Sequence, residues 1–290
     1  DSSERAADTE VDTAAVLAQR GVTSVTLDWR GTLFEGASHL SSWDAQEVGA
    51  YEGEVGPMAI DAGRTYEGAN DFYSDSPARV AQVFAQALGA AGINATLGEA
   101  GEPPAGAAAL ATVSSATMGE QLRWMLAHSD NTLADQYCRF AARAAGAPAT
   151  YEGATSTVAS TLSAAGVPTD GLFLEDCSGL SSNDRISANT LVGVLKASYS
   201  GQGTSADTMR LLPWAGLVGT LSRLMTEEPA VGNVQAKTGA LAEVSSLSGS
   251  VITRGGRVLL VSIGHDQVTA GALATRGRLD AFEEGLAGLN

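Results

Sequence analysis

The chain has 290 residues, of which 44% are hydrophobic and only 6% aromatic, so its core is expected to consist mainly of Ala, Val and Leu. The formal net charge of −16 argues against a protein that binds nucleic acid through phosphates and against adsorption to anionic lipid. No apolar run approaches the roughly 20 residues that would span a bilayer.

The first 75 residues predict few regular elements. A helix is expected from Asp12, as its N-cap, to residue 18, with Gly21 as terminator. Alternating apolar residues predict a strand over 25–29. The stretch 30–75 is rich in Gly, Ser, Asp and Glu, and it should be mostly loop with one or two short strands.

A clear amphipathic helix follows, with Ser76 as its cap, Pro77 in its first turn and Gly92 after its end. The next segment, 98–107 (GEAGEPPAGA), is dense in Gly and Pro. It is the strongest linker candidate, and we expect the main domain boundary near it.

Beyond this linker the pattern becomes more regular. Four helices are expected over about 117–128, 132–145, 154–165 and from a cap at Ser187 onward, followed by strands over 234–238, 246–253 and 258–264 and a last helix over 270–286. Gly255-Gly256 suits a two-residue hairpin turn between the last two strands. Helices followed by antiparallel strands predict a mixed α/β fold of the α+β kind, not a series of βαβ units.

Several familiar catalytic sites can be set aside. There is no GxSxG elbow, no phosphate-binding glycine loop and no HExxH motif. The three histidines (His39, His128 and His265) are far apart, so nothing local supports a Ser-His-Asp triad. Cys138 and Cys177 are not in a CxxC or Cys/His cluster, and a disulfide and two buried thiols are equally good interpretations.

Two short motifs remain. Taken alone, Ser129-Asp130-Asn131 is a helix cap, because these residue types satisfy the first N–H groups of a helix. Taken alone, Lys237-Thr238-Gly239 is a solvated lysine before a turn. Lys237 nevertheless requires attention, because the chain has only one other lysine, Lys196, against 15 arginines.

Together and in this order, the two motifs indicate a catalytic site more strongly than either does alone. S-x-x-K, S-D-N and K-T-G are the motif set of penicillin-binding proteins and class A β-lactamases. An acyl-serine enzyme without histidine needs an amine and a hydroxyl to move protons, and the amine must be poised by burial or by a neighbouring cation. A strand edge can also offer a backbone N–H to the developing oxyanion.

Longer segments strengthen this similarity. The chain resembles the D-alanyl-D-alanine carboxypeptidase/endopeptidase family of low-molecular-mass class C penicillin-binding proteins (DacB-like, peptidase family S13) in QLRWMLAHSDNTLADQYCRFAA, LEDCSGLSSNDRISANTLVGVL, LPWAGLVGTLSRLM and VQAKTGALAEVSSLSGSVITRGGRVLLVSIG. GVTSVTLDWRGTLFEG and GPMAIDAGR resemble, more loosely, the region that this family inserts between its first two motifs.

The resemblance implies a penicillin-binding transpeptidase-like domain, an antiparallel sheet flanked by helices, with a partial inserted domain at the N-terminus. Residues 1–108 would be the remainder of the inserted region, which looks short for the family, and residues 109–290 the C-terminal part of the transpeptidase-like domain. A segment equivalent to the family's DGSGLS, with Asp176, Ser178 and Gly179, would be a scaffold beside the cleft. Lys196 is interpreted as a solvated surface lysine.

The resemblance also implies roles for the motif residues. Ser129 would be the proton-relay hydroxyl, Asn131 the substrate-orienting amide and Lys237 the cation that shapes the site; Asp130 fits capping as well as catalysis. For substrate binding, Thr238 would contact the carboxylate, Gly239 would let the substrate backbone approach, and the Ala240 N–H would be an oxyanion donor. We expect Asn131 and Lys237 to face one groove.

The sequence departs from the family in two ways. Ala240 stands where many relatives carry a hydroxyl residue, so one carboxylate contact is lost. The chain also contains no S-x-x-K: Gly193 and Val234 stand three residues before its two lysines. It begins at Asp1 without a signal peptide, as expected of a processed protein or part of a longer one. Two hypotheses follow, a nucleophile supplied by upstream sequence and a non-catalytic module that binds stem peptides.

The implied partners are peptidoglycan stem peptides and β-lactams, outside the cytoplasmic membrane, with no nucleic acid and no transmembrane segment. An extracytoplasmic location permits a disulfide between Cys138 and Cys177. No cofactor is expected, because the residues give no physical argument for a metal or an organic group. The oligomeric state, the preference between carboxypeptidase and endopeptidase, and the stem-peptide chemistry are left open.

Overall fold

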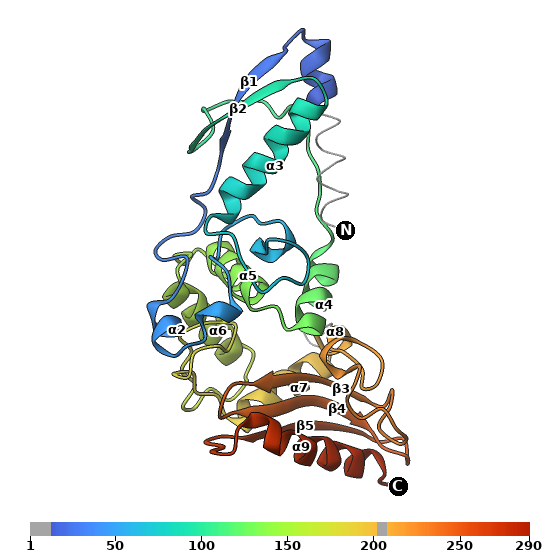
Figure 1. Ribbon diagram of the computed structural model, residues 1–290. Helices are drawn as coiled ribbons and strands as arrows, with labels where there is room; N and C mark the ends of the chain where they lie inside the picture. The colour runs from blue at the N-terminus through green and yellow to red at the C-terminus, as the bar shows by residue number, and fades with distance from the viewer. Residues whose placement is uncertain (1–12, 202–207) are drawn as a thin grey trace. The chain divides into compact units, whose positions relative to one another are not determined.

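The computed structural model describes residues 13–201 and 208–290, which form two compact units (Figure 1). The first unit comprises the chain up to Thr117, Asn131–Thr157 and Asp176–Ser182; the second comprises Met118–Asp130, Val158–Glu175 and Asn183–Asn290. The units therefore interleave along the chain. The division into an inserted part, 1–108, and a transpeptidase-like part, 109–290, stays a prediction.

The first unit contains a parallel pair of strands that the sequence did not reveal. Strands β1 (Ser24–Trp29) and β2 (Asn94–Ala100) pair in parallel and are connected through helix α3 (Ser76–Ala90), which packs on both. Residues 13–19 are helical, and Gly21 follows in the left-handed region with φ 69°, as predicted; the expected cap, Asp12, lies outside the described residues. β2 occupies the start of the segment interpreted as a linker.

Helix α3 begins one residue earlier than predicted. Asp75, not Ser76, is its N-cap, because the Asp75 carboxylate accepts the N–H of Ala78 at 2.8 Å. Gly92 follows its end with φ 88°, as expected.

The stretch before α3 contains helical turns in place of the expected short strands: α2 (Ser41–Ala45), η1 (Gly49–Tyr51) and η2 (Asp61–Gly63). Its strand-like pairing is one isolated bridge between Arg64 and Phe72 among the described residues. Gly, Asp and Ser satisfy their backbone locally and do not extend a ladder, which accounts for the missing strands.

Helix α5 (Asn131–Ala144) organises the loops of the first unit. Arg139 on this helix is buried and donates to the backbone carbonyls of Glu35, Ala37, Val55 and Ala149. An arginine has five N–H donors in a fixed fork, so one side chain holds three separate loop segments on α5. The unit also contains the start of helix α6 (Tyr151–Ala164).

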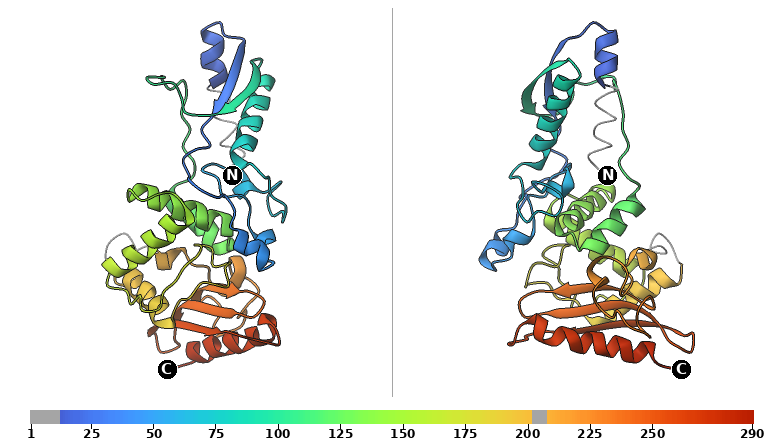
Figure 2. Two further views of the ribbon diagram at one scale, coloured as in Figure 1. Left: turned by 90° about the vertical axis from the view of Figure 1, so that its left-hand side faces the viewer. Right: turned by 45° about the vertical axis from the view of Figure 1, so that its right-hand side comes forward.

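The second unit is built on an antiparallel sheet in the order β3 (Val234–Ala240), β4 (Ser245–Ile252), β5 (Val258–His265). Helix α9 (Ala272–Ala287) packs along one face of the sheet (Figures 1 and 2), over a core that includes Val234, Ala236, Leu247 and Val251. Apolar residues of helices α4 (Met118–His128), α7 (Ala188–Tyr199) and α8 (Thr208–Leu211) pack together with Leu260 of β5.

The fold class is therefore the one predicted, an antiparallel sheet flanked by helices. The predicted helices at α4, α5, α6, α7 and α9 and all three strands are confirmed, and Ser187 caps α7 by accepting the N–H of Thr190. The turn between β4 and β5 is longer than the two residues expected, because the strands end at Ile252 and resume at Val258. Lys196 is exposed, as predicted.

None of the helices within the described ranges, 13–201 and 208–290, combines the length and the apolarity needed to cross a membrane.

Candidate active site

Ser129 terminates helix α4 in an unusual backbone conformation. It has φ 56°, in the left-handed region, and the N–H of Asp130 donates to the carbonyl of Met125 at 3.0 Å. This is the hydrogen bond of a Schellman motif, in which the left-handed position is normally a glycine. Serine at such a position costs about 1 kcal/mol, so the side chain is held there against a backbone preference.

The hydroxyl of Ser129 contacts Lys237 on strand β3. The Lys237 ammonium donates to Ser129 Oγ at 2.7 Å and to the backbone carbonyl of Thr238, also at 2.7 Å. Ser129 and Lys237 are 108 positions apart in the sequence, and both belong to the second unit. The end of α4 and the middle of β3 thus bring together the amine and the hydroxyl that histidine-free acyl transfer requires.

Burial lowers the pKa of Lys237 from 10.5 to about 8, and the positive charge of Arg276 on α9 contributes to the same shift. The amine therefore changes its charge close to physiological pH. Its positive form attracts a carboxylate, and its neutral form can accept a proton, so a lysine poised in this way can take either part in acid–base chemistry.

Among the described residues, the outer edge of β3 is paired over only half of its length. Residues 213–215 accept the N–H of Ala236 and donate to the carbonyl of Val234. Alternate residues of a strand direct their backbone groups to the same edge, so those of Thr238 and Ala240 also point outward, past the end of this pairing. The Ala240 N–H is therefore placed where an added strand or an oxyanion could accept it.

Thr238 and Gly239 are fixed by neighbours within the second unit. The hydroxyl of Thr238 donates to that of Thr220 at 3.2 Å, in the short helix η4 (Gly219–Leu221). A Cβ on Gly239 would lie too close to the Ser246 hydroxyl of β4, which would have to rotate away to admit a larger residue. Thr220 was not among the candidate site residues predicted from the sequence, although it lies within LPWAGLVGTLSRLM, one of the segments that carry the family resemblance.

Asn131 belongs to the first unit, where it is the first residue of α5. Its side-chain amide donates to the backbone carbonyl of Tyr51 at 3.0 Å, and the neighbouring Thr132 hydroxyl accepts the N–H of Gly53 at 3.0 Å. Segment 51–53 therefore runs along the first turn of α5. That Asn131 and Lys237 face one groove stays a prediction.

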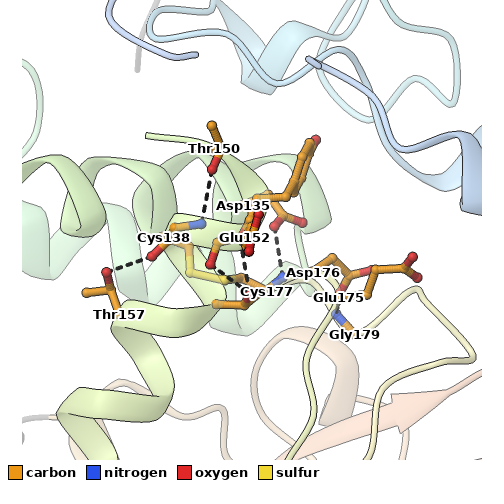
Figure 3. Close-up of a disulfide and its surroundings, with 12 residues drawn as sticks. Asp135, Cys138, Thr150, Glu152, Thr157, Glu175, Asp176, Cys177 and Gly179 are labelled. Atoms are coloured by element: carbon orange, nitrogen blue, oxygen red, sulfur yellow. Dashed lines mark hydrogen bonds between the residues drawn. A yellow bond between two sulfur atoms is a disulfide. The ribbon is translucent and has the colours of Figure 1, made fainter. Parts of the chain in front are cut away.

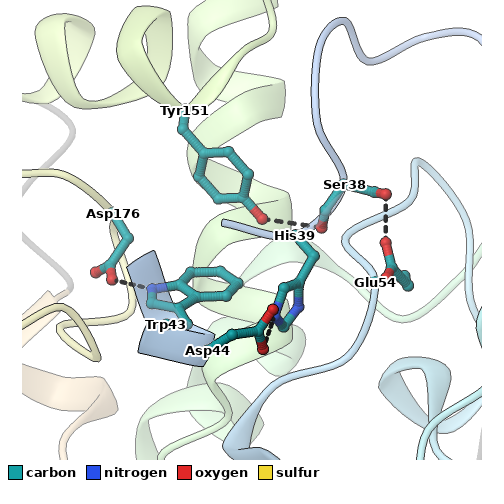
Figure 4. Close-up of polar contacts among 7 residues, drawn as sticks. All are labelled: Ser38, His39, Trp43, Asp44, Glu54, Tyr151 and Asp176. Atoms are coloured by element: carbon teal, nitrogen blue, oxygen red, sulfur yellow. Dashed lines mark hydrogen bonds and ion pairs between the residues drawn. The ribbon is translucent and has the colours of Figure 1, made fainter. Parts of the chain in front are cut away.

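The segment at 176–181 is held by Asp176. This buried carboxylate accepts the N–H groups of Gly179 and Ser181 and the indole N–H of Trp43, at 2.6–2.8 Å (Figure 4). These contacts hold the segment in place; that it is a scaffold beside the cleft stays a prediction.

Cys138 on α5 and Cys177 form a disulfide, which decides between the two interpretations of the cysteines (Figure 3). The N–H of Cys177 also donates to the carboxylate of Asp135 at 2.8 Å, so two adjacent contacts attach the 176–181 segment to α5.

No group of three or more His, Cys, Asp or Glu side chains in the described part of the chain is arranged to hold a metal ion.

Comparison with known proteins gives one consistent family. Residues 70–286 match the sequence model of the D-Ala-D-Ala carboxypeptidase 3 (S13) family. The chain is 34% identical to Carboxypeptidase DacB of Mycolicibacterium smegmatis over 262 residues, 87% of this chain and 56% of that one. It is 34% identical to Carboxypeptidase Rv3627c of Mycobacterium tuberculosis over 258 residues, 86% of this chain and 55% of that one. The chain thus spans little more than half the length of these relatives.

Solved structures agree on the fold. Penicillin binding protein 4 (dacB) of Haemophilus influenzae superimposes with a TM-score of 0.75 at 20% identity, over 94% of this chain and 76% of that one. A structure of the same protein complexed with a β-lactam gives a TM-score of 0.61 at 27% identity, over 74% of this chain and 50% of that one.

Proposed function

The chain belongs to the D-Ala-D-Ala carboxypeptidase 3 (S13) family, and from this premise we propose that it forms part of a serine-type D-Ala-D-Ala carboxypeptidase or endopeptidase of peptidoglycan that binds β-lactams. Two features support the proposal together. The Lys237 ammonium is hydrogen-bonded to Ser129, and it lies beside an edge of β3 where the N–H groups of Thr238 and Ala240 have no backbone partner among the described residues.

In this proposal Ser129 and Lys237 move protons. Ser129 Oγ accepts a hydrogen bond from Lys237, so its own hydroxyl hydrogen is free to be donated to a leaving-group nitrogen. Lys237 replaces that proton, which its lowered pKa of about 8 makes easier than for an ordinary lysine. The direction of transfer reverses when water attacks the acyl-enzyme.

The substrate lies along β3 in this proposal. Its backbone pairs with the outward groups of Thr238 and Ala240, and the Ala240 N–H stabilises the oxyanion of the tetrahedral intermediate. The cation of Lys237 and the hydroxyl of Thr238 hold the terminal carboxylate, Gly239 leaves room for the substrate, and the amide of Asn131 orients a substrate carbonyl. Ala240 offers no hydroxyl, which weakens carboxylate binding relative to family members that have one.

The serine nucleophile and its lysine are the parts that these 290 residues do not contain, since no S-x-x-K occurs in them. We propose that sequence preceding Asp1 supplies both. The curated relatives are nearly twice as long as the matched region, which leaves room for such a segment.

An extracytoplasmic location accompanies this proposal. The Cys138–Cys177 disulfide supports it, because disulfides persist in oxidising compartments and are rare in the cytosol. The proposed partners are peptidoglycan stem peptides.

Labelling with a fluorescent penicillin tests the proposal on the protein expressed with its upstream sequence. We expect a covalent adduct, and for Lys237→Ala an acylation rate at least ~100-fold lower, since acid–base groups typically contribute that much. Lys196→Ala is the matched control, because it removes the only other lysine of the chain, an exposed one, and should leave the rate unchanged. Absence of any adduct on folded protein would reject the enzyme.

A second candidate function is a non-catalytic module that holds stem peptides. The lack of S-x-x-K and the alanine at position 240 favour it. It predicts saturable, reversible binding of a D-Ala-D-Ala peptide with no change in protein mass. A penicilloyl mass shift on the natural protein would eliminate this alternative.

A further inference from the structure

A buried glutamate lies between the two contacts that fix the start of α5. Tyr51 accepts the amide of Asn131, Gly53 donates to Thr132, and Glu52 stands between them. The Glu52 side chain is only 3% exposed and interacts with Asp135, one turn beyond Asn131 on the same helix and 0% exposed. Asn131, whose side-chain amide is proposed to orient the substrate, therefore lies next to the buried carboxyl groups of Glu52 and Asp135.

The two carboxyl groups lack the donors that two negative charges would need. Asp135 Oδ1 accepts the N–H of Cys177, and the Ser178 hydroxyl lies close enough to lower the pKa of both carboxyl groups. By hydrogen-bond geometry, however, Asp135 Oδ2 and both oxygens of Glu52 have no partner among the described residues. Buried ionised oxygens without donors are very costly, so such a site retains a proton. One proton held between Glu52 and Asp135 gives the pair a donor and removes a charge.

The surrounding charges favour the same protonation state. Asp176 adds negative charge near the pair, and the Ser178 hydroxyl partly offsets it. Arg139 contributes the positive charge on this side, but its N–H groups are engaged by backbone carbonyls and do not pair with either carboxylate. The Tyr151 hydroxyl is neutral, because burial raises its pKa.

Burial raises the pKa of Asp135 to about 7 and that of Glu52 well above its usual value. The negative charge of Asp135 raises the pKa of Glu52 further, and that of Asp176 raises the pKa of Asp135, whereas the hydrogen bond with Glu52 lowers the pKa of Asp135.

We propose that Glu52 and Asp135 share one proton, and that this carboxyl pair is a positioning device for Asn131. While the proton is held, segment 51–53 stays on α5 and the Tyr51 carbonyl fixes the Asn131 amide. When the proton is lost to solvent, repulsion between the carboxylates loosens the segment and the amide loses its partner. The role of Asn131 rests on the proposed function, whereas the shared proton does not.

The sign of the pH effect follows from the raised pKa values. The closed junction binds more protons than the opened one above pH ~5, so opening releases a proton and becomes easier as the pH rises. Because opening releases one proton, its equilibrium constant increases about tenfold for each unit by which the pH rises. The junction is therefore expected to be tightest in mild acid and to loosen toward alkaline pH.

Hydrogen exchange of the 290-residue chain measures this opening without any substrate. We expect the protection factors of the Gly53 and Cys177 amides to fall about tenfold per unit between pH 5 and 7. Glu52→Gln, which mimics the protonated carboxyl group, should largely remove this dependence. Glu54→Gln is the matched control: it neutralises the next acidic residue of the same segment and should behave as the unsubstituted chain.

Asp135→Asn provides a second variant, because an asparagine can still accept the Cys177 N–H and can donate to Glu52. It too should flatten the pH dependence. Equal slopes in the unsubstituted chain and in both variants would overturn the shared proton.

Acylation by penicillin tests the positioning role separately. The ratio of the Glu52→Gln rate to the unsubstituted rate should rise with pH, because only the unsubstituted junction loosens. A constant ratio, with the exchange result as expected, would overturn the positioning of Asn131 but leave the shared proton. No acylation of any form would defeat the proposed function, and the exchange result would still decide the carboxyl pair.

Discussion

At Ser129 the backbone conformation favours glycine, whereas the contact with Lys237 requires a hydroxyl group. Its left-handed backbone terminates α4, a task for which glycine is better suited, yet its hydroxyl is the acceptor for Lys237. Strain of this kind persists where the surrounding structure over-determines a side chain, and it is typical of functional positions. Stability and proton transfer therefore favour different residues at position 129.

Replacing Ser129 separates the two effects. We expect Ser129→Gly to preserve or raise the free energy of unfolding, by up to about 1 kcal/mol, because it relieves the left-handed backbone. Ser129→Ala should lower it, because alanine keeps the strain and loses the hydrogen bond. Both should abolish rapid acylation in the protein with its upstream sequence. Denaturant unfolding and penicillin labelling measure the two properties, and a stability order with alanine above glycine would contradict the strain.

At the scale of single residues, the sequence predicted the motif residues but not the residues that contact or influence them. Ser129 and Lys237 are recognisable because each lies in a motif, and the scarcity of lysine singles out Lys237. Thr220 and Arg276 lie in no catalytic motif: Thr220 contacts Thr238 from the short helix η4, and Arg276 influences Lys237 from a helix about 40 residues away. Their importance arises only when the sheet, η4 and α9 are assembled.

Among the secondary-structure elements, those determined by adjacent residues were predicted correctly, and those that depend on a partner far along the chain were not. Ser187 caps α7 through its own neighbours, so the sequence around it was sufficient. Strand β2 depends on β1, about 70 residues earlier in the chain, and its Leu97 is 42% exposed, so no alternation marks it. Asp75 and Ser76 are both good caps side by side, and the choice between them depends on where the helix packs.

Helix α9 contains a buried carboxyl group that weakens the fold. Glu283 is buried in the second unit, and its Oε1 has no hydrogen-bond partner among the described residues. Burial raises the pKa of Glu283 from 4.5 to about 7, and the negative charge of Asp280 adds to the shift. The folded chain therefore holds this proton more tightly than the unfolded chain, and stability is lost as the pH rises from about 4.5 to 7.

Glu283→Gln should remove that loss. We expect the free energy of unfolding to increase by about 3 kcal/mol at pH 8 and to change little at pH 4, where the glutamate is largely protonated in both states. Denaturant unfolding at the two pH values measures the difference. Glu284→Gln, an exposed neighbour on the same helix, is the control; an equal gain for both variants would refute burial as the cause.

In the molecule as a whole, compact units are assembled from segments that are not consecutive. The first unit takes α5 and the 176–182 segment from the middle of the chain, and the disulfide joins them across 39 positions. Hydrogen bonds of Asp135 and Asp176 hold the same segment, so covalent and polar contacts support one arrangement.

Removing the disulfide should therefore weaken the first unit without changing its fold. Cys138→Ala together with Cys177→Ala is expected to lower the free energy of unfolding by up to about 4 kcal/mol, the loop-closure value for a link of this length. The midpoint of denaturant unfolding reports the loss. Reductant should bring the unsubstituted chain to the same midpoint and leave the double variant unaffected; a midpoint independent of both would show that the polar contacts suffice.

The half-covered edge of β3 has a consequence for self-association. Exposed strand edges invite pairing with other copies of a protein, and proteins resist this with short edges and charged side chains. Here residues 213–215 occupy one half of the edge, and Lys237 holds a positive charge beside the other half. The remaining half of the edge is long enough to pair with a short peptide but too short to pair stably with a full strand of another copy. The geometry that could bind a ligand therefore also disfavours aggregation through this edge.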